Sequence, residues 1–236
     1  KRFNTPNDLC IDSKGRIYFT DPRYGSREGM EITLDTTNSS SASTKPGLRS
    51  GFAITNESID GIFTEHQSKV ESVYRINAPR EVTKVLTGGL VTGGLTGMQR
   101  PNGILISPDN RFLYIADNNN NTHGGSRKLL RYTLDENGDV KPGTRKVIFD
   151  WKDGRGPDGM KMDAAGRIYV AAGTNKATDY ETTRFKAGCY ILSPSGRLID
   201  FIPTFPDECC NCAFGGKDGK TLFITSGGHL WSVPLK

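Results

Sequence analysis

The sequence has little of what several common protein classes require. Only three of its 236 residues are histidine, at positions 66, 123 and 229, so a histidine-based catalytic set is not expected. No apolar run approaches the roughly 18 residues of a membrane-spanning helix. Lysine and arginine number 31 against 26 for aspartate and glutamate, and they form no basic block. We therefore expect no membrane and no nucleic acid as a partner.

Cysteine is also scarce and unevenly placed. Of the five cysteines, Cys189, Cys209, Cys210 and Cys212 lie near the C-terminal end, and no histidine stands at zinc-ligand spacing nearby. An odd count in this setting predicts ordinary buried thiols.

What the sequence does contain is an internal repeat. Each copy reads as a short apolar strand, a turn rich in Asp, Asn and Gly, and a second apolar strand, which is the pattern of a β-hairpin. Helical periodicity is not sustained anywhere. The four copies begin at Asn7, Asn102, Asp158 and Asn211, at intervals of 95, 56 and 53 residues.

The spacing of the copies predicts the fold. Further alternating segments, such as 128–134 and 188–202, follow the hairpins, so each repeat supplies about four strands. Four-stranded units that recur about every fifty residues predict an all-β chain, a β-propeller forming a single domain over residues 1–236. The longer first interval predicts an insertion at about residues 33–69, interpreted as a surface loop or, alternatively, a lid over the site.

The first residue of each copy points to a shared site. In a propeller the innermost strand of every blade lines the central tunnel, so residues at one end of these strands converge. Asn7, Asn102, Asp158 and Asn211 all carry a side-chain oxygen, which is the ligand type that hard divalent cations prefer. The alternative is that each residue only caps its strand by bonding local backbone. Four such residues in register favour the shared site.

The residues around these positions follow a common form. Three copies read Pro-(Asn/Asp)-(Asp/Gly), namely Pro6-Asn7-Asp8, Pro101-Asn102-Gly103 and Pro157-Asp158-Gly159. The proline restricts the backbone and holds the next side chain in one direction of approach. The glycine is expected to leave room beside the tunnel for a metal ion or a substrate.

These boxes, together with the segments 18–22 and 211–216, resemble the gluconolactonase/regucalcin (senescence marker protein 30) family. The resemblance runs from about Asn4 to Trp231 and is interrupted by the insertion. It implies a six-bladed propeller, of which about four blades are present here. It also implies one divalent metal ion in the tunnel (Ca²⁺, or Zn²⁺, Mn²⁺ or Mg²⁺) and the hydrolysis of sugar lactones or related esters.

The resemblance also assigns residues. Asn102 and Asp158 match metal ligands of the family, Asn7 matches an asparagine near both metal and substrate, and Asp8 is its neighbour in that box. We therefore expect Asn7, Asn102 and Asp158 at the metal, and Asn7 and Asp8 at the substrate. Two features depart from the family. No counterpart of its first-blade glutamate ligand is present, and Thr5 stands where the family has a substrate-contacting arginine.

The resulting hypothesis is metal-assisted lactone hydrolysis. The cation would polarise the lactone carbonyl and lower the pKa of a water molecule. Asp158 is predicted to be both a metal ligand and the general base, because it alone among the four converging residues carries a charge, and Asp8 is the alternative base. Two other functions stay open: a non-catalytic propeller that binds a partner, and an aryl-ester or phosphotriester hydrolase on the same site.

The number of repeats also sets an expectation about length. Four blades and an insertion occupy all 236 residues, whereas six blades would need roughly a hundred more. We expect the chain to be the C-terminal two-thirds of a longer enzyme, inactive without the remaining blades of the same protein, which would cover its open sheet edges. The compartment, cytoplasmic or secreted, is left open.

Overall fold

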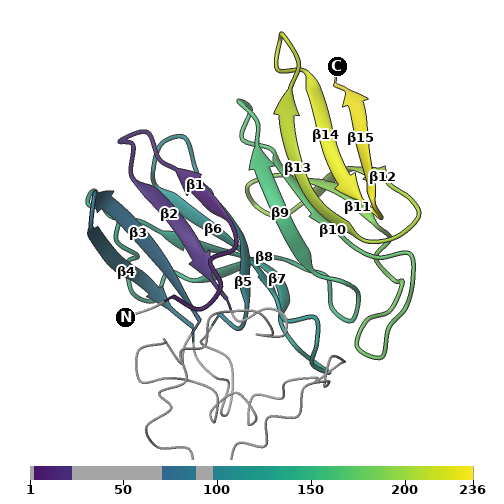
Figure 1. The fold of residues 1–236 in the computed structure, drawn as a ribbon, viewed down its shortest axis with the longest axis horizontal. Coiled ribbons are helices and arrows are strands. Elements are labelled where there is room, and N and C mark those ends of the chain that lie inside the picture. Colours follow the sequence, from purple (N-terminus) through teal and green to yellow (C-terminus); the bar gives the residue numbers. More distant parts are fainter. Residues whose placement is uncertain (1–2, 23–70, 89–97, 236) are drawn as a thin grey trace, which may run out of the picture.

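The computed structural model describes residues 3–22, 71–88 and 98–235, and the predicted insertion at 33–69 lies outside these ranges. Its strands form four antiparallel sheets that follow one another along the chain (Figure 1). This is the predicted all-β propeller architecture, and each copy of the repeat opens one sheet with its innermost strand. Within the described ranges, no helix is long and apolar enough to cross a membrane.

Three sheets have four strands each and the last has three. The first consists of β1 (Leu9–Ile11), β2 (Ile17–Asp21), β3 (Ser72–Ala78) and β4 (Glu81–Thr87). The second consists of β5 (Pro101–Ile106), β6 (Phe112–Asn118), β7 (Arg127–Thr133) and β8 (Lys146–Asp150). The third consists of β9 (Pro157–Met162), β10 (Ile168–Ala172), β11 (Gly188–Leu192) and β12 (Leu198–Pro203). The last consists of β13 (Cys209–Gly215), β14 (Thr221–Ser226) and β15 (His229–Pro234).

The sheets pack face to face. Because successive side chains of a strand point to opposite faces of its sheet, alternate residues pack against the preceding and the following sheet. Ile104 and Ile106 of β5 pack toward Tyr18 and Val73 of the first sheet. Leu105, between them in sequence, joins the core that lies between the second and third sheets. A third cluster fills the space between the third and fourth sheets. Because both faces of the middle sheets are covered, strands β5, β10 and β11 are buried along their whole length, unlike the strands of a sheet with one solvated face.

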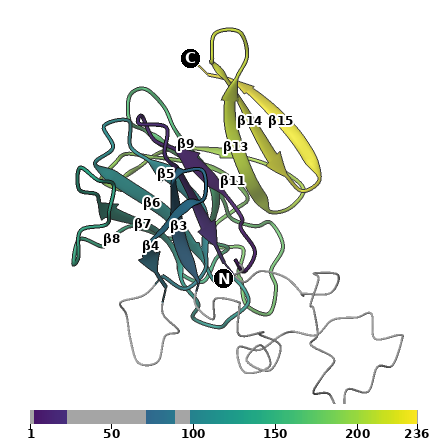
Figure 2. The ribbon, with the colours of Figure 1, turned by 60° about the vertical axis from the view of Figure 1, so that its left-hand side comes forward.

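The sheets form an arc (Figures 1 and 2). Strands β1, β5, β9 and β13 lie side by side in this order, with β1–β4 at one end of the arc and β13–β15 at the other. At the ends the pattern of burial changes. Leu9 and Ile11 of β1 are 56% and 61% exposed, and Leu230 of β15 is 70% exposed, whereas every residue of β5 is buried.

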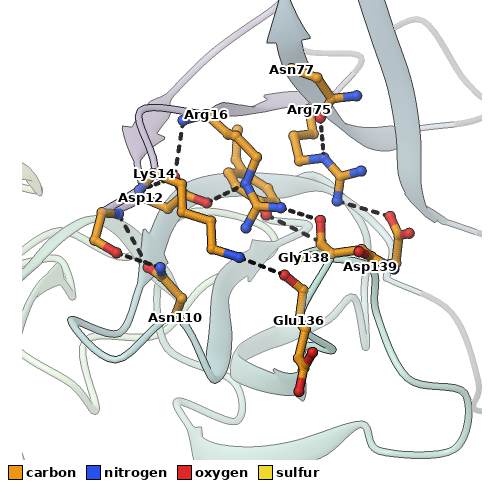
Figure 3. A network of polar contacts seen from close by, with 12 residues as sticks. Asp12, Lys14, Arg16, Arg75, Asn77, Asn110, Glu136, Gly138 and Asp139 are labelled. Atoms are coloured by element: carbon orange, nitrogen blue, oxygen red, sulfur yellow. Dashed lines mark hydrogen bonds and ion pairs between the residues drawn. The ribbon is translucent and has the colours of Figure 1, made fainter.

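A polar network joins the first sheet to the second at the end opposite the repeat boxes (Figure 3). Arg16 and Arg75 both reach toward the turn at 136–139, where Arg75 pairs with Asp139 at 2.8 Å. Arg16 donates to the Asn137 carbonyl. The buried hydroxyl of Tyr18 donates to the Gly138 carbonyl at 3.1 Å. These contacts fix how one blade sits against the next.

Removing the Tyr18 hydroxyl is expected to weaken this junction. Tyr18→Phe deletes a buried hydrogen bond and leaves the Gly138 carbonyl without that donor, so unfolding should become easier by about 1 kcal/mol. Urea unfolding followed by tryptophan fluorescence measures the change. Tyr180→Phe, at an exposed tyrosine, is the control and should leave the midpoint unchanged. Equal midpoints for the two variants would contradict a bridging role for Tyr18.

Candidate active site at the tunnel end

The repeat boxes lie where the innermost strands begin. Pro101 of β5 pairs with Asp117 at the end of β6, and Pro157 of β9 pairs with Ala172 at the end of β10. The boxes therefore share one end of the propeller with the loops that follow β6 and β10. This places Asn102 and Asp158 at the same end of neighbouring innermost strands, as their register predicted.

The box glycines have a different role from the one predicted. A Cβ on Gly103 would lie 2.1 Å from the backbone oxygen of Asp158, and a Cβ on Gly159 would lie 2.1 Å from Oδ1 of Asn211. Both distances are far below van der Waals contact. The space beside each glycine is thus occupied by the box of the next blade, and the glycines allow adjacent innermost strands to approach closely.

In the first box Asp8 stands in place of the glycine, and its carboxylate reaches the next blade. Oδ1 of Asp8 accepts a hydrogen bond from the Leu9 N–H at 2.8 Å, and Oδ2 accepts one from the Ile104 N–H at 3.4 Å. The Thr20 hydroxyl donates to the Asn102 carbonyl at 2.7 Å. Asp8 is therefore held facing the second box.

Asp158 is the electrostatic centre of the site. Burial first, and then the nearby Glu208 and Asp8 carboxylates, raise its pKa to about 7, while Arg155 and a hydrogen bond from the Asn102 side chain act to lower it. Its side chain keeps partial access to solvent. The negative charges of the carboxylates around Asp158 are therefore only partly balanced by the positive charge of Arg155.

A charged pair that the sequence analysis did not single out adjoins Asp158. Arg155 forms ion pairs with Glu208 at 2.9 Å and with Glu181 at 3.4 Å. Burial alone would lower the pKa of Arg155, but the carboxylates of Glu208, Glu181 and Asp158 raise it, so the guanidinium stays charged. The sequence did contain a signal for the pair: Arg155 and Glu208 each stand three residues before the first residue of a repeat copy, Asp158 and Asn211.

The other residues considered in the sequence analysis make hydrogen bonds to the backbone. Asn7 is exposed, and its backbone N–H donates to the Thr20 carbonyl at 3.0 Å. Oδ1 of Asn211 accepts from the N–H of Cys212 at 2.8 Å, which is the local capping arrangement that was the alternative for this residue type. Thr5 donates to the Pro22 carbonyl.

All five cysteines are free thiols. Burial, together with the Asp158 and Glu208 carboxylates, raises the pKa of Cys210 to about 11.

The donor set at the tunnel end fits a hard divalent cation. Within the described ranges no group of three or more His, Cys, Asp or Glu side chains forms a ready-made metal centre. The Asn102 amide and the Asp158 carboxylate nevertheless offer oxygen ligands. The Asp158 carboxyl group lies near two further carboxylates, of Glu208 and Asp8, and one guanidinium, of Arg155, so a cation would offset the repulsion that, after burial, raises the pKa of Asp158.

Comparison with known proteins agrees with this geometry. The family model described as "SMP-30/Gluconolactonase/LRE-like region" matches residues 1–228. A gluconolactonase of Zymomonas mobilis is 29% identical over 242 residues, which cover all of this chain and 52% of that protein. A 6-deoxy-6-sulfogluconolactonase of Pseudomonas putida is 36% identical over 128 residues, covering 53% of this chain and 37% of that one.

A solved structure has the same fold. A gluconolactonase from Xanthomonas campestris superposes with a TM-score of 0.62 and 26% identity, covering 100% of this chain and 59% of that chain. The chain thus spans about half the length of the curated relatives that it matches. Since the family model covers nearly the whole sequence, the chain belongs to the SMP-30/gluconolactonase/LRE-like family.

Proposed function

We propose that the protein hydrolyses sugar lactones at the tunnel end that holds Asn102 and Asp158. The observation that carries the proposal is the position of Asp158, a carboxylate at the start of β9 set between the Asn102 amide, two further carboxylates and Arg155. Family membership and the two lactonases among the relatives support the same reaction class.

The chain's own residues account for positioning and proton transfer. In this mechanism Asp158 accepts a proton from the attacking water, whose oxygen forms a bond to the lactone carbonyl carbon. The ring C–O bond then breaks, and the ring oxygen takes up a proton to give the open hydroxy acid. Asn7 and Asp8, at the neighbouring inner strand, would bind substrate hydroxyl groups. Arg155, held by Glu208 and Glu181, stays charged beside the acyl group.

Asn102 and Asp158 would hold the divalent cation that the family resemblance implies. When bound, such a cation supplies Lewis acidity toward the lactone carbonyl. Ca²⁺, Mg²⁺, Mn²⁺ and Zn²⁺ all accept oxygen ligands of this kind.

The experiment is a pH-drop assay on the intact protein, with glucono-lactone, an aryl ester and a phosphotriester as substrates. We expect lactone hydrolysis above the spontaneous rate, loss of at least about 100-fold in kcat/KM after chelation with EDTA, and recovery on adding back a divalent cation. Preferred turnover of the aryl ester or the phosphotriester would instead indicate that other class of hydrolase. No turnover of any substrate, with or without metal, would favour a binding propeller.

A further inference from the structure

A cavity of about 490 Å³ lies between the first and second sheets, away from the strands that line the tunnel. One wall is the end of β4, the outermost strand of the first sheet. The other wall comes from β7 and from residues 140–145, which lead into β8, the outermost strand of the second sheet. Met98, just before β5, lies between the two walls. Cavities of this size commonly bind small molecules.

The floor of the cavity is apolar. Met98 and Tyr132 are buried and belong to the core between the first and second sheets, and the half-buried Leu86 and Val140 pack against the same core. Pro142 adds an exposed apolar ring to the lining. An apolar ligand group that enters the cavity would cover this surface and leave water itself, which is the main source of favourable binding energy for apolar groups.

Backbone contacts hold the segment 140–145 in place. The N–H of Lys141 donates to the Thr133 carbonyl at 2.9 Å. The Thr144 hydroxyl accepts from the N–H of Thr133 at 3.1 Å and donates to the Lys141 carbonyl at 2.6 Å. An isolated bridge pairs Val140 with Leu134. The wall therefore has a fixed backbone, and binding there requires little ordering of the chain.

The charged side chains of the cavity are all positive. They belong to Lys141 and Arg145, and no aspartate or glutamate of the described residues lines the cavity with them. Lys141 is exposed and Arg145 is half-buried, so both are accessible to solvent. Neither forms an ion pair within the described ranges of the chain. The cavity thus combines an apolar floor with two cations that lack a carboxylate partner there.

The carboxylate that interacts electrostatically with Arg145 is engaged elsewhere. Asp117 is fully buried and does not line the cavity, and its Oδ1 accepts from the N–H groups of Gln99 and Arg100 at 2.9 and 2.7 Å. Arg145 lies beside the Tyr132 hydroxyl instead. Burial raises the pKa of Tyr132 to about 12, although the Arg145 guanidinium acts to lower it. The cation is therefore set at the edge of the apolar floor.

We propose that this cavity binds an amphipathic carboxylate, with an alkyl chain over Met98 and Leu86 and the head group at Lys141 and Arg145. The chain matches the apolar floor, and the head group forms charge-assisted hydrogen bonds with the two cations. A neutral alcohol matches only the floor, and acetate matches only the charges. The site goes beyond the proposed lactonase activity, because it lies at other strands and binding there makes or breaks no covalent bond.

Methyl NMR on protein labelled with ¹³C at the methionine Cε tests the site, with octanoate as the probe. Met98 lines the cavity, whereas Met160 lies in the core between the second and third sheets. We expect octanoate to shift the Met98 signal saturably, with a dissociation constant on the order of 1 mM, and to leave the Met160 signal in place. Met98→Leu and Met160→Leu assign the two signals. 1-Octanol and acetate should each bind at least about tenfold more weakly.

Arg145→Gln should weaken octanoate binding at least about tenfold, because a charge-assisted hydrogen bond is lost. Lys141→Gln, at an exposed position, should weaken it about threefold and is the second test of the charges. Lys146→Gln is the matched control, since Lys146 follows Arg145 and is exposed on β8 but does not line the cavity. Its affinity should change less than about twofold.

The proposal fails if octanoate leaves the Met98 signal unchanged, or if 1-octanol or acetate binds as tightly as octanoate. It also fails if Arg145→Gln and Lys141→Gln, shown folded by their unfolding midpoints, bind octanoate as Lys146→Gln does.

Discussion

Asp158→Asn is expected to lower kcat/KM for glucono-lactone by at least about 10³-fold in the intact protein. The substitution keeps the shape of the side chain and removes its charge, so under the proposed mechanism the attacking water would lose its proton acceptor and a cation would lose its charged ligand. The variant should still fold, because the carboxyl group stands where burial and two other carboxylates already disfavour its charge. Initial rates of lactone opening, corrected for spontaneous hydrolysis, measure the effect.

Asp200→Asn is the matched control for this change. Asp200 lies in the same sheet, on β12, with an exposed side chain whose Oδ1 accepts a hydrogen bond from the N–H of Phe201. Its kcat/KM should remain within a factor of two of wild type. An Asp158→Asn enzyme that keeps more than a tenth of wild-type activity would show that Asp158 is not the base, and Asp8 would then be the residue to test.

Gly103→Ala has the largest expected effect on stability. The added methyl group would lie 2.1 Å from the Asp158 backbone oxygen, so strands β5 and β9 must separate to admit it. Overpacking of this kind between backbone segments should lower the free energy of unfolding by at least about 3 kcal/mol. Because the displaced strand carries Asp158, lactone hydrolysis should fall as well. Urea unfolding and the lactone assay, performed on the same preparation, measure the two effects.

The control separates steric overlap from backbone strain. Gly143 has a φ of 72° with nothing within 4 Å of an added Cβ, so Gly143→Ala meets only the left-handed penalty of about 1 kcal/mol. Activity should not change there. If the two alanine variants were equally stable, the close approach of β5 and β9 would not be what requires the glycine.

The sequence was sufficient to predict the blades. The repeated hairpin pattern indicates the order of the strands, and the residues that open each copy mark where the innermost strand begins. Asn102 and Asp158 could be placed at one end of neighbouring strands for the same reason. The box glycines were misinterpreted, since spacing within one repeat carries no information on how closely the next repeat approaches. Gly103 faces the Asp158 backbone, which lies 55 residues away in the sequence.

The charged surroundings of Asp158 could be found only partly from the sequence. Arg155 and Glu208 each stand three residues before the first residue of a repeat copy. Whether two residues at this position form an ion pair depends on the angle between blades, which the sequence does not give. Nε of Arg127 and Oε1 of Glu181 have no hydrogen-bond partner in the described part of the chain, and this could not be foreseen from the sequence. It depends on which donors and acceptors in neighbouring loops satisfy one another, and that outcome is set by the packing of the loops.

The measurement that bears most directly on this account is anomalous diffraction from crystals soaked in Mn²⁺ after chelation. The account predicts one strong peak within bonding distance of Oδ1 of Asn102 and the carboxylate of Asp158, absent from Asp158→Asn crystals. A peak bound elsewhere in the protein would contradict it. The account would also be contradicted if the soaked crystals showed no peak and the same protein still opened the lactone ring at the full rate after chelation.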